Sequence, residues 1–417
     1  MDTEIRERDV PRNFLALLGD YVLFAIGFAF YDPLVIVPAF VKEFTGSELL
    51  VGLFSALRIL MITLPQLWAA SYLVARPRKK PLLIWATFWG RFPLLLLIIA
   101  TWFWTDTHVW LTMVVLAVTT TCFYISEALN GVSWPALVGK VIPDHLRGRL
   151  FGVGQLLSSL SAMGVGYGVG LILGEAGAAQ PGRWALLFTC AFVGLMLSLV
   201  SMLFIREEPD DKVSTQISVR ESVRSMWGYL RTDGSLRRVV IVQLILSFAS
   251  AAFPFFVVRA REVFPGNDAI IGAFVTTQSV GGAAAALVGG YLIDKVGSWA
   301  AIRLGAVVQV VALLAVTFAG FVGPAQVFYF VAFFLLGFVI SSGWWSFSAY
   351  LLDMATEEQR PIYLATNGML NSLTIANPII VGGLFELLLP ELVFAVTAAL
   401  SLIGAALAWT LRKGERE

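Results

Sequence analysis

Four ionisable side chains lie inside segments that are otherwise almost entirely apolar: Asp32, Arg58, Arg91 and Glu127. If these segments cross a bilayer, each charge costs at least about 2.5–3.5 kcal/mol on insertion scales, so each needs a partner or a task. A carboxyl group that is removed from water favours its neutral form, which lets it load and unload protons. The residue types therefore predict ion pairing and proton transfer within a membrane.

The first predicted pair combines Asp32 and Arg58. Asp32 lies ten residues before Lys42, at the outer end of the first apolar segment. Arg58 lies eleven residues after Ser47, where the second segment begins, and equal depth on antiparallel helices favours an ion pair. Pro33 would loosen the backbone and free carbonyl groups to line a cavity. Two interpretations remain open: a charged feature in the outer half of a substrate path, or a neutralised pair that holds two helices together.

Glu127 is the predicted proton-carrying residue. It lies thirteen residues before Lys140, nearer the predicted cytoplasmic side, and Arg91 is at similar depth in the third segment. The alternatives are a permanent Glu127–Arg91 ion pair or a carboxylate that faces lipid or water. Asp20 and Glu386, near segment ends, are expected to be interfacial. The candidate proton-coupling residues are Glu127, Asp32 and Arg91.

The composition is that of an integral membrane protein. Mean hydropathy is +0.81, with 58% hydrophobic and 14% charged residues, whereas soluble proteins contain roughly 25% charged residues. Such a chain would aggregate in water unless lipid covered it. A net charge of +1 without a basic stripe inside the spans predicts no nucleic-acid partner. Cys122 and Cys190 lie in apolar runs, which predicts packing roles, and we expect neither a metal site nor a cofactor.

Twelve windows are apolar and long enough, at about 20 residues, for a helix to cross a bilayer. They are about 13–40, 49–74, 82–103, 109–139, 150–173, 184–205, 239–260, 269–293, 299–320, 326–352, 362–388 and 392–411. The predicted fold class is therefore an all-α membrane protein with twelve transmembrane helices.

The basic residues predict which way the spans face. With the N-terminus in the cytoplasm, 23 lysines and arginines fall on inward segments and four on outward segments; Arg58 and Arg91 inside spans complete the total of 29. The positive-inside rule therefore predicts a multi-pass protein of the cell membrane (plasma or inner membrane) with both termini cytoplasmic. The four outward residues are Lys42, Arg183, Arg259 and Arg261.

One long polar stretch, from Arg206 to Arg238, separates two apolar parts of similar length. The predicted domains are an N-terminal six-helix bundle (1–205), a cytoplasmic linker (206–238) and a C-terminal six-helix bundle (239–417). Within the linker, Ser218–Leu230 places apolar and charged residues on opposite faces, which favours a helix at the lipid headgroups. A solvated flexible linker is the alternative for residues 207–218.

The two halves also resemble each other. Residues 133–160 align with residues 346–373 at a constant offset, so that Ser133 meets Ser346 and Arg147 meets Arg360. Each identity alone is weak, but a constant offset together with matching topology favours a duplicated unit. We therefore expect two pseudo-symmetric six-helix bundles.

Short motifs add a family resemblance. Gly290–Gly297 carries Asp294 and Lys295 between two spans, Ala70–Lys80 carries a basic cluster, and Glu127–Ser133 carries a polar pattern within the fourth span. With twelve spans and two repeats, these segments resemble the major facilitator superfamily. Gly290–Gly297 resembles its loop signature, Ala70–Lys80 has Val74 where an Asp is usual, and Glu127 replaces the Arg of an Arg-x-x-Gln-Gly pattern.

The resemblance implies a secondary transporter that works by alternating access, with the two bundles rocking around a midplane site. Asp294 beside Lys295 and facing Arg147 would form a gate that latches the inner ends of the bundles. An ordinary solvated turn is the alternative for this segment. The rest of the expected substrate cavity is polar but uncharged, which suits an uncharged or weakly charged organic solute. The candidate substrate-binding residues are Tyr31, Asp32, Arg58, Asn130, Trp134, Gln243, Gln278, Trp344, Trp345, Asn367 and Asn371.

The expected function is transport of a small organic solute, with protons as the candidate coupling ion. The expected partners are that solute and the lipid bilayer, and the protein is expected to act as a monomer. An exporter or flippase of amphipathic molecules is the alternative within transport. A receptor that does not transport, or an intramembrane enzyme, comes from another class. The sequence has no H-E-x-x-H motif or nucleophile elbow, and His108 and His145 lie outside the spans, so no enzyme activity is expected.

Overall fold

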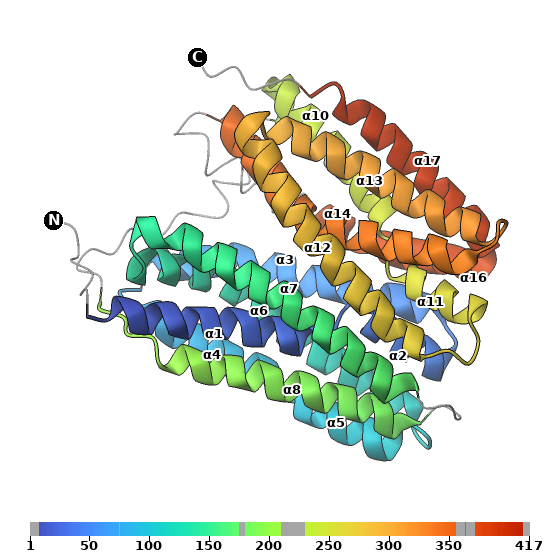
Figure 1. Cartoon of the computed structure of the whole chain (residues 1–417), viewed down its shortest axis with the longest axis horizontal. Coiled ribbons are helices and arrows are strands. Elements are labelled where there is room, and N and C mark those ends of the chain that lie inside the picture. Colours follow the sequence, from blue (N-terminus) through green and yellow to red (C-terminus); the bar gives the residue numbers. More distant parts are fainter. Residues whose placement is uncertain are drawn as a thin grey trace. The chain divides into compact units, whose positions relative to one another are not determined.

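A computed structural model describes residues 8–74, 76–174, 180–209, 230–355, 363 and 372–411. All regular elements in these residues are helices (Figure 1). They are α1 (Val10–Ala29), α2 (Ile36–Thr45), α3 (Glu48–Val74), α4 (Lys80–Arg91), α5 (Pro93–Trp104), α6 (Val109–Val141), α7 (Asp144–Gly174), α8 (Pro181–Leu203), α10 (Gly234–Ser250), α11 (Phe255–Val263), α12 (Ala269–Lys295), α13 (Ser298–Ala319), α14 (Ala325–Met354), the 3-10 helix η1 (Thr374–Ala376), α16 (Asn377–Leu387) and α17 (Pro390–Ala408).

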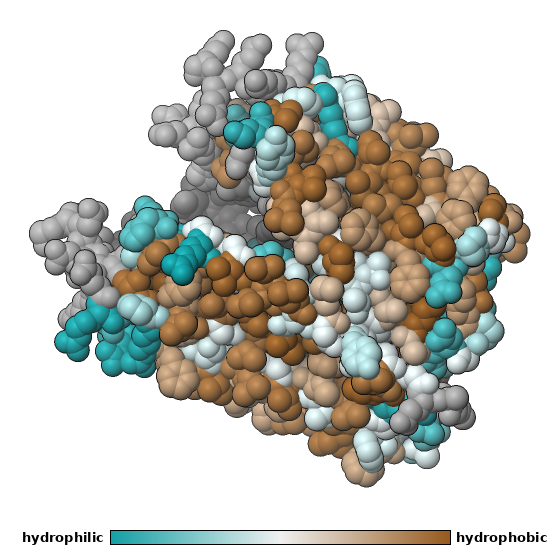
Figure 2. All heavy atoms as spheres, viewed as in Figure 1, coloured by the Kyte–Doolittle hydropathy of each residue, from teal (hydrophilic) through white to brown (hydrophobic). Residues whose placement is uncertain are grey.

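The predicted membrane fold is confirmed. Among the described residues, eleven helical segments are long and apolar enough to cross a membrane, close to the twelve predicted. The remaining predicted span, window 362–388, contains the shorter apolar helix Thr374–Leu387, and most of its first part lies outside the described residues. Many large apolar side chains are exposed, and Figure 2 shows them over much of the visible surface, as expected for a chain that lipid covers.

Proline interrupts several of the predicted spans, among them the first and the seventh. The first window contains α1 and α2, which are separated by a turn that includes Asp32 and Pro33. The window 239–260 contains α10 and α11, with Pro254 at the N-cap of α11. Proline has no backbone N–H to donate and its ring crowds the preceding turn, so it interrupts a helix. The loosened backbone expected beside Pro33 is therefore present.

The chain forms two compact units. Unit 1 comprises Met1–Asp32 and Leu60–Val219, and unit 2 comprises Pro33–Ile59 and Arg220–Glu417. The segment Pro33–Ile59, which includes α2 and the first part of α3, thus packs with helices that follow it by about two hundred residues. The division at residues 205 and 238 stays a prediction, and the amphipathic helix predicted at Ser218–Leu230 lies almost entirely outside the described residues.

Close backbone contacts bring the helices of unit 1 together. A Cβ on Gly90 of α4 would lie 2.1 Å from the Ser126 Cβ of α6, and a Cβ on Gly194 of α8 would lie 2.8 Å from the Gly27 Cα of α1. Only glycine fits such approaches. α1 packs against α8, and α4 packs against both α6 and α8. As a result, polar residues on four different helices of unit 1 come within hydrogen-bonding distance.

The segment that follows α8 connects two other helices of unit 1. The Glu207 carboxylate, whose side chain is 1% exposed, accepts hydrogen bonds from the backbone N–H groups of Lys79 and Lys80 at 2.7 and 2.8 Å. It also pairs with Lys140 Nζ at 3.0 Å. A carboxylate at a helix N-terminus satisfies orphan N–H groups and complements the helix dipole. Glu207 therefore connects α4 to α6. The alternative prediction, a solvated flexible linker over residues 207–218, is wrong at this residue.

Candidate functional site

A set of polar side chains, buried except for the half-buried Glu127 and Trp134, occupies the interior of unit 1, and we call it the unit 1 network. It draws on α1, α4, α6 and α8. Its members are linked to one another by hydrogen bonds or by an ion pair. They are Asp20, Thr87, Arg91, Ser126, Glu127, Asn130, Trp134 and Ser198.

Arg91 is the cation of this network and is 1% exposed. Its Nη2 lies 4.0 Å from the Oε1 of Glu127, and its Nη1 donates to Ser198 Oγ at 3.1 Å and to the carbonyl oxygen of Leu195. Its guanidinium also lies 5.5 Å from the centre of the Phe24 ring. The structure therefore brings together Arg91 and Glu127, the pair that the sequence offered as one of its alternatives.

Asp20 is a second carboxylate of the network. It is 3% exposed, accepts a hydrogen bond from Trp134 Nε1 at 2.8 Å, and accepts another from Ser198 Oγ. The expected interfacial position of Asp20 is wrong. A signal was present: if the helix begins near Val10, a rise of about 1.5 Å per residue places Asp20 about 15 Å along it, near the middle of a bilayer.

Asn130 and Trp134, two predicted substrate-binding residues, also belong to this network. Asn130 Nδ2 donates to Ser126 Oγ and Glu127 Oε1, both at 3.3 Å, and its Oδ1 accepts from Thr87 Oγ1 at 3.3 Å. Trp134 uses its single N–H on Asp20. Both side chains thus orient the carboxylates in this conformation, and their contact with a substrate stays a prediction.

The charge balance of the network is uneven. Two carboxylates, those of the buried Asp20 and the half-buried Glu127, interact with one guanidinium, that of Arg91. An uncompensated buried charge is costly, at several kcal/mol per ion after relaxation. One bound proton would leave one carboxylate paired with one guanidinium. The arrangement is therefore chemically suited to bind and release a single proton.

The outer predicted residues lie in different surroundings. Tyr31 is 1% exposed, its hydroxyl lies 3.2 Å from Thr120 Oγ1, and its ring packs edge-on against Phe123 and Phe188. Asp32 is half-buried in the turn after α1 and has an interaction partner. Arg58 is half-buried on α3, with an Nε that finds no hydrogen-bond partner in the described part of the chain. The Asp32–Arg58 pair stays a prediction.

The candidate cavity residues of unit 2 are only partly located. Gln243 on α10 and Gln278 on α12 are half-buried, and each has an interaction partner. α14 contains Trp344 and Trp345, whose side chains lie outside the described set, and Asn367 and Asn371 lie outside it altogether. Their role in substrate binding stays a prediction.

The predicted latch is likewise untested. Lys295 is exposed at the end of α12, and the side chain of Asp294 lies outside the described set. Arg147 binds within unit 1: its Nε donates to the carbonyl oxygen of Ile142 at 3.0 Å, and its guanidinium pairs with Asp144. These contacts close the C-terminal end of α6. A latch between Asp294 and Arg147 stays a prediction.

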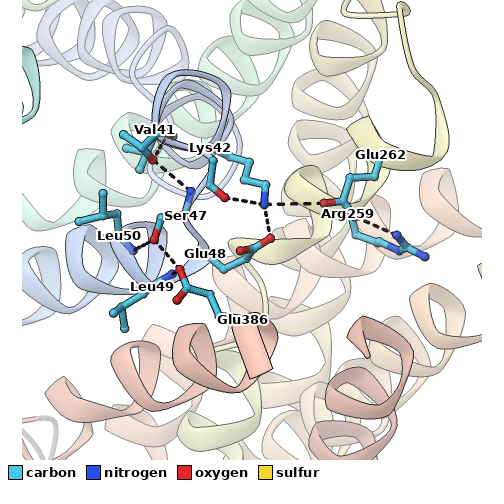
Figure 3. Close-up of polar contacts among 11 residues, drawn as sticks. Val41, Lys42, Ser47, Glu48, Leu49, Leu50, Arg259, Glu262 and Glu386 are labelled. Atoms are coloured by element: carbon cyan, nitrogen blue, oxygen red, sulfur yellow. Dashed lines mark hydrogen bonds and ion pairs between the residues drawn. The ribbon is translucent and has the colours of Figure 1, made fainter. Parts of the chain in front are cut away.

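A second polar group, which we call the unit 2 ion cluster, joins α2 and the start of α3 to α11 and to the end of α16 (Figure 3). It also joins α11 to the start of α17. It was not predicted from the sequence. Its members are Lys42, Glu43, Ser47, Glu48, Arg259, Arg261, Glu262, Asp268, Glu386 and Glu391.

Arginine and lysine side chains connect this cluster across helices. Arg261 Nη2 lies 2.8 Å from Glu43 Oε2 and 3.0 Å from Asp268 Oδ1, and Lys42 Nζ lies 3.8 Å from Glu262 Oε1 (Figure 3 shows the lysine contact). Arg259 pairs with Glu262 at 2.8 Å and also with Glu391. The bonded segments are about two hundred residues apart in sequence.

Glu386 anchors the start of α3. Its carboxylate accepts hydrogen bonds from Ser47 Oγ and, at 3.0 Å, from the backbone N–H of Leu49 (Figure 3). Glycines allow α3 and α16 to touch beneath it: a Cβ on Gly52 would lie 2.2 Å from the carbonyl oxygen of Pro378. Glu386 is exposed, as expected for an interfacial residue, but the sequence did not indicate that it caps another helix.

No group of three or more histidine, cysteine, aspartate or glutamate side chains in the described residues could hold a metal ion. Cys122 and Cys190 are free and half-buried. The chemistry that the described polar side chains support is ion pairing and proton binding.

Comparisons with known proteins agree with this fold. No curated protein sequence is significantly similar to the chain. Its fold resembles that of a D-xylose-proton symporter (TM-score 0.72, 13% identity, covering 98% of this chain and 99% of the other). It also resembles a bacterial homologue of the iron transporter ferroportin in an inward-facing state (TM-score 0.70, 15% identity, covering 96% of this chain and 99% of the other). A third similar structure is the nucleoside transporter NupG (TM-score 0.68, 12% identity, covering 95% of this chain and 98% of the other).

At these identities the structural likeness shows the fold alone. The sequence model of the Major Facilitator Superfamily matches residues 20–376 and 260–417, which together cover almost the whole chain. The chain therefore belongs to the major facilitator superfamily.

Proposed function

We propose that this protein is a secondary transporter that moves a small organic solute by alternating access and couples the movement to protons. Its family and its all-helical membrane fold support the transporter class. The observation that carries the coupling is the charge count of the unit 1 network, in which two carboxylates, the buried Asp20 and the half-buried Glu127, interact with one guanidinium.

The proton is held between Asp20 and Glu127. With both ionised, the buried network carries one excess negative charge, and binding one proton removes it. A conformation that admits water to the network stabilises the ionised carboxylates and favours release. The affinity for the proton then differs between conformations, which is the condition for coupling it to a transport cycle.

The unit 2 ion cluster serves as the outer gate. It holds Pro33–Ile59 against α11 and α16, which belong to the same unit, in this conformation. Opening the gate separates half-exposed ion pairs, which are worth about 0.2–1 kcal/mol each. Such pairs can break and re-form within a cycle.

The transported solute is an uncharged or weakly charged organic molecule. Half-buried amide groups at Gln243 and Gln278 are side chains that suit such a molecule. Structural neighbours named as xylose and nucleoside transporters are consistent with a solute of this kind. The protein acts as a monomer in the cell membrane with both termini in the cytoplasm.

Transport in proteoliposomes tests the coupling. Radiolabelled D-xylose and a radiolabelled nucleoside are the first probes, after a thermal-shift screen that widens the set. We expect wild-type protein to accumulate solute when a pH gradient is imposed. Glu127→Gln and Asp20→Asn should lose this accumulation but keep counterflow exchange, because a neutral side chain mimics the protonated state. Asp144→Asn, which changes an exposed carboxylate of the same unit, is the matched control.

If Glu127→Gln and Asp20→Asn both respond to the pH gradient as wild type does, the proton is not carried here. Topology has its own test. A cysteine at Arg78 should resist a membrane-impermeant thiol reagent added to whole cells, and labelling from outside would overturn the assigned orientation.

A further inference from the structure

A pocket of about 950 Å³ opens in unit 1, away from the polar network. Its walls come from the starts of α1 and α4, the ends of α6 and α8 and the residues that follow α8. It has a charged end and an apolar end, and we call it the α4–α8 pocket. The lining residues on which the inference depends are Arg78, Lys80, Trp85, Phe88, Leu203 and Arg206.

The apolar end consists of side chains that would face lipid. Trp85 is 60% exposed, Phe88 is 38% exposed and Leu203 is 51% exposed. All three lie within helices long and apolar enough to cross a membrane. Trp85 is five residues from the start of α4, a position where tryptophan is enriched because its ring suits the membrane interface.

The charged end has hydrogen-bond donors that are not used within the protein. Lys80 Nζ donates to the carbonyl oxygens of Leu203, at 2.9 Å, and Ile205, so one of its three N–H groups is left. Arg78 is exposed and has no hydrogen-bond or ion-pair partner in the described part of the chain. Its planar guanidinium can bind two oxygens of a phosphate at once.

The acidic residues that line the pocket are already engaged. Asp9 pairs with Arg206 at 2.9 Å. Glu207 is saturated by two backbone N–H groups and by Lys140. Glu208 has an interaction partner of its own. The donors that remain therefore favour a negatively charged ligand.

The geometry points to an anionic phospholipid: we infer that the α4–α8 pocket binds the headgroup phosphate and the first acyl carbons of one such lipid. It would come from the leaflet on the N-terminal side of the protein, which the positive-inside rule places in the cytoplasm. Basic pockets between membrane helices on that side are suited to anionic lipid headgroups. This inference is independent of the transported solute and of proton coupling.

The length of the pocket distinguishes a phospholipid from a small soluble anion as its ligand. Lys80 and Phe88 are eight residues apart on α4, so a rise of about 1.5 Å per residue places them about 12 Å apart along the helix. A free phosphate would use only the charged end. A phospholipid uses the charged end for its phosphate and the apolar wall of Trp85 and Phe88 for its chains.

Native mass spectrometry of the purified full chain tests this inference. The protein in detergent is titrated with phosphatidylglycerol, with phosphatidylcholine and with inorganic phosphate. Arg78→Gln is compared with Arg149→Gln, an exposed arginine of unit 1 outside the pocket, and Trp85→Ala with Trp89→Ala. Trp89 is 54% exposed on the same helix and does not line the pocket, so it is matched to Trp85.

We expect one phosphatidylglycerol to bind more tightly than phosphatidylcholine. Arg78→Gln should weaken it about fivefold, the effect of about 1 kcal/mol for one basic residue near anionic lipid, and Arg149→Gln should not. Trp85→Ala should weaken binding while Trp89→Ala leaves it unchanged. Any of three results would overturn the assignment. The two variants of a matched pair could lose the same lipid affinity, the two lipids could bind equally tightly, or inorganic phosphate could bind as tightly as phosphatidylglycerol.

Discussion

In the unit 1 network the side chain of Arg91 is 1% exposed and that of its partner Glu127 is 17% exposed, whereas in the unit 2 ion cluster Lys42, Arg259 and Arg261 are 21%, 27% and 19% exposed. The first set is held within one unit by helices that approach closely. The second joins α2 and the start of α3 to helices that follow much later in the chain.

Burial sets how each region can work. Arg91 is shielded from water, so its charge must be balanced by the carboxylates beside it, and the unit 1 network can respond to a change in charge by binding or releasing a proton. A half-exposed pair loses little when it separates, because water replaces the partner. The unit 2 ion cluster can therefore break and re-form, which suits a gate, and the following predictions test this contrast.

The largest effect is expected from removing the buried cation. Arg91→Leu leaves two carboxylates without a counter-ion and should lower the free energy of unfolding by about 3–5 kcal/mol. Arg259→Leu removes a half-exposed cation and should lower it by about 1 kcal/mol or less. Thermal unfolding of both variants in the same detergent measures the difference, and equal shifts would remove the distinction between the two regions.

The two carboxylates of the network should not act independently. Asp20→Asn or Glu127→Gln alone should change the free energy of unfolding by about 1 kcal/mol, since one neutral carboxyl is tolerated. The double variant leaves Arg91 without any carboxylate and should cost about 3–5 kcal/mol. A double-mutant cycle gives the coupling energy, and additive single effects would show that the carboxylates do not share one counter-ion.

The contact beneath the outer gate can be weakened without touching a charge. Gly52→Ala places a Cβ against the backbone of Pro378 and should cost about 1–3 kcal/mol through overpacking. It should also raise the reactivity of a cysteine placed at Ser47 toward a thiol reagent. Gly139→Ala is the matched control, because its Cβ meets nothing within 4 Å. It should change neither the free energy of unfolding nor the reactivity of the cysteine. A Gly52→Ala protein that behaves like the control would argue against close packing of α3 on α16.

The smallest effect concerns salt. Lys42→Gln should destabilise the closed form of the gate, in which the unit 2 ion cluster is intact, by about 0.2–1 kcal/mol. Raising the ionic strength should reproduce part of this destabilisation in the wild type. Reactivity of the same cysteine at Ser47 reports on both. Since Arg91 is shielded from solvent, salt should not alter the stability effect of Arg91→Leu, and a parallel salt response would contradict the burial argument.

The sequence predicted the helices well because hydrophobic length and proline are local signals. It placed Arg91 and Glu127 at similar depth, and it found the backbone break beside Pro33. It misjudged Asp20 because helix depth depends on where the first helix begins, and an uncertainty of a few residues moves a side chain from the interface to the interior.

The unit 2 ion cluster depends on pairings between residues about two hundred positions apart, which no local pattern encodes. A weak signal was available nonetheless. Three of the four basic residues predicted to face outward, Lys42, Arg259 and Arg261, belong to the cluster. Positive charges that the positive-inside rule assigns to the outer side, against the general bias, were therefore a guide to specific ion pairs.

Infrared difference spectroscopy of the purified protein tests the central claim most directly, because it observes the proton itself. At neutral pH we expect the carbonyl stretch of one protonated carboxylic acid in the wild type. This band should shift or disappear in Glu127→Gln or Asp20→Asn and remain unchanged in Asp144→Asn. A wild-type spectrum without a protonated carboxyl band, or a band that survives in the Asp20→Asn, Glu127→Gln double variant, would contradict a proton held between Asp20, Arg91 and Glu127.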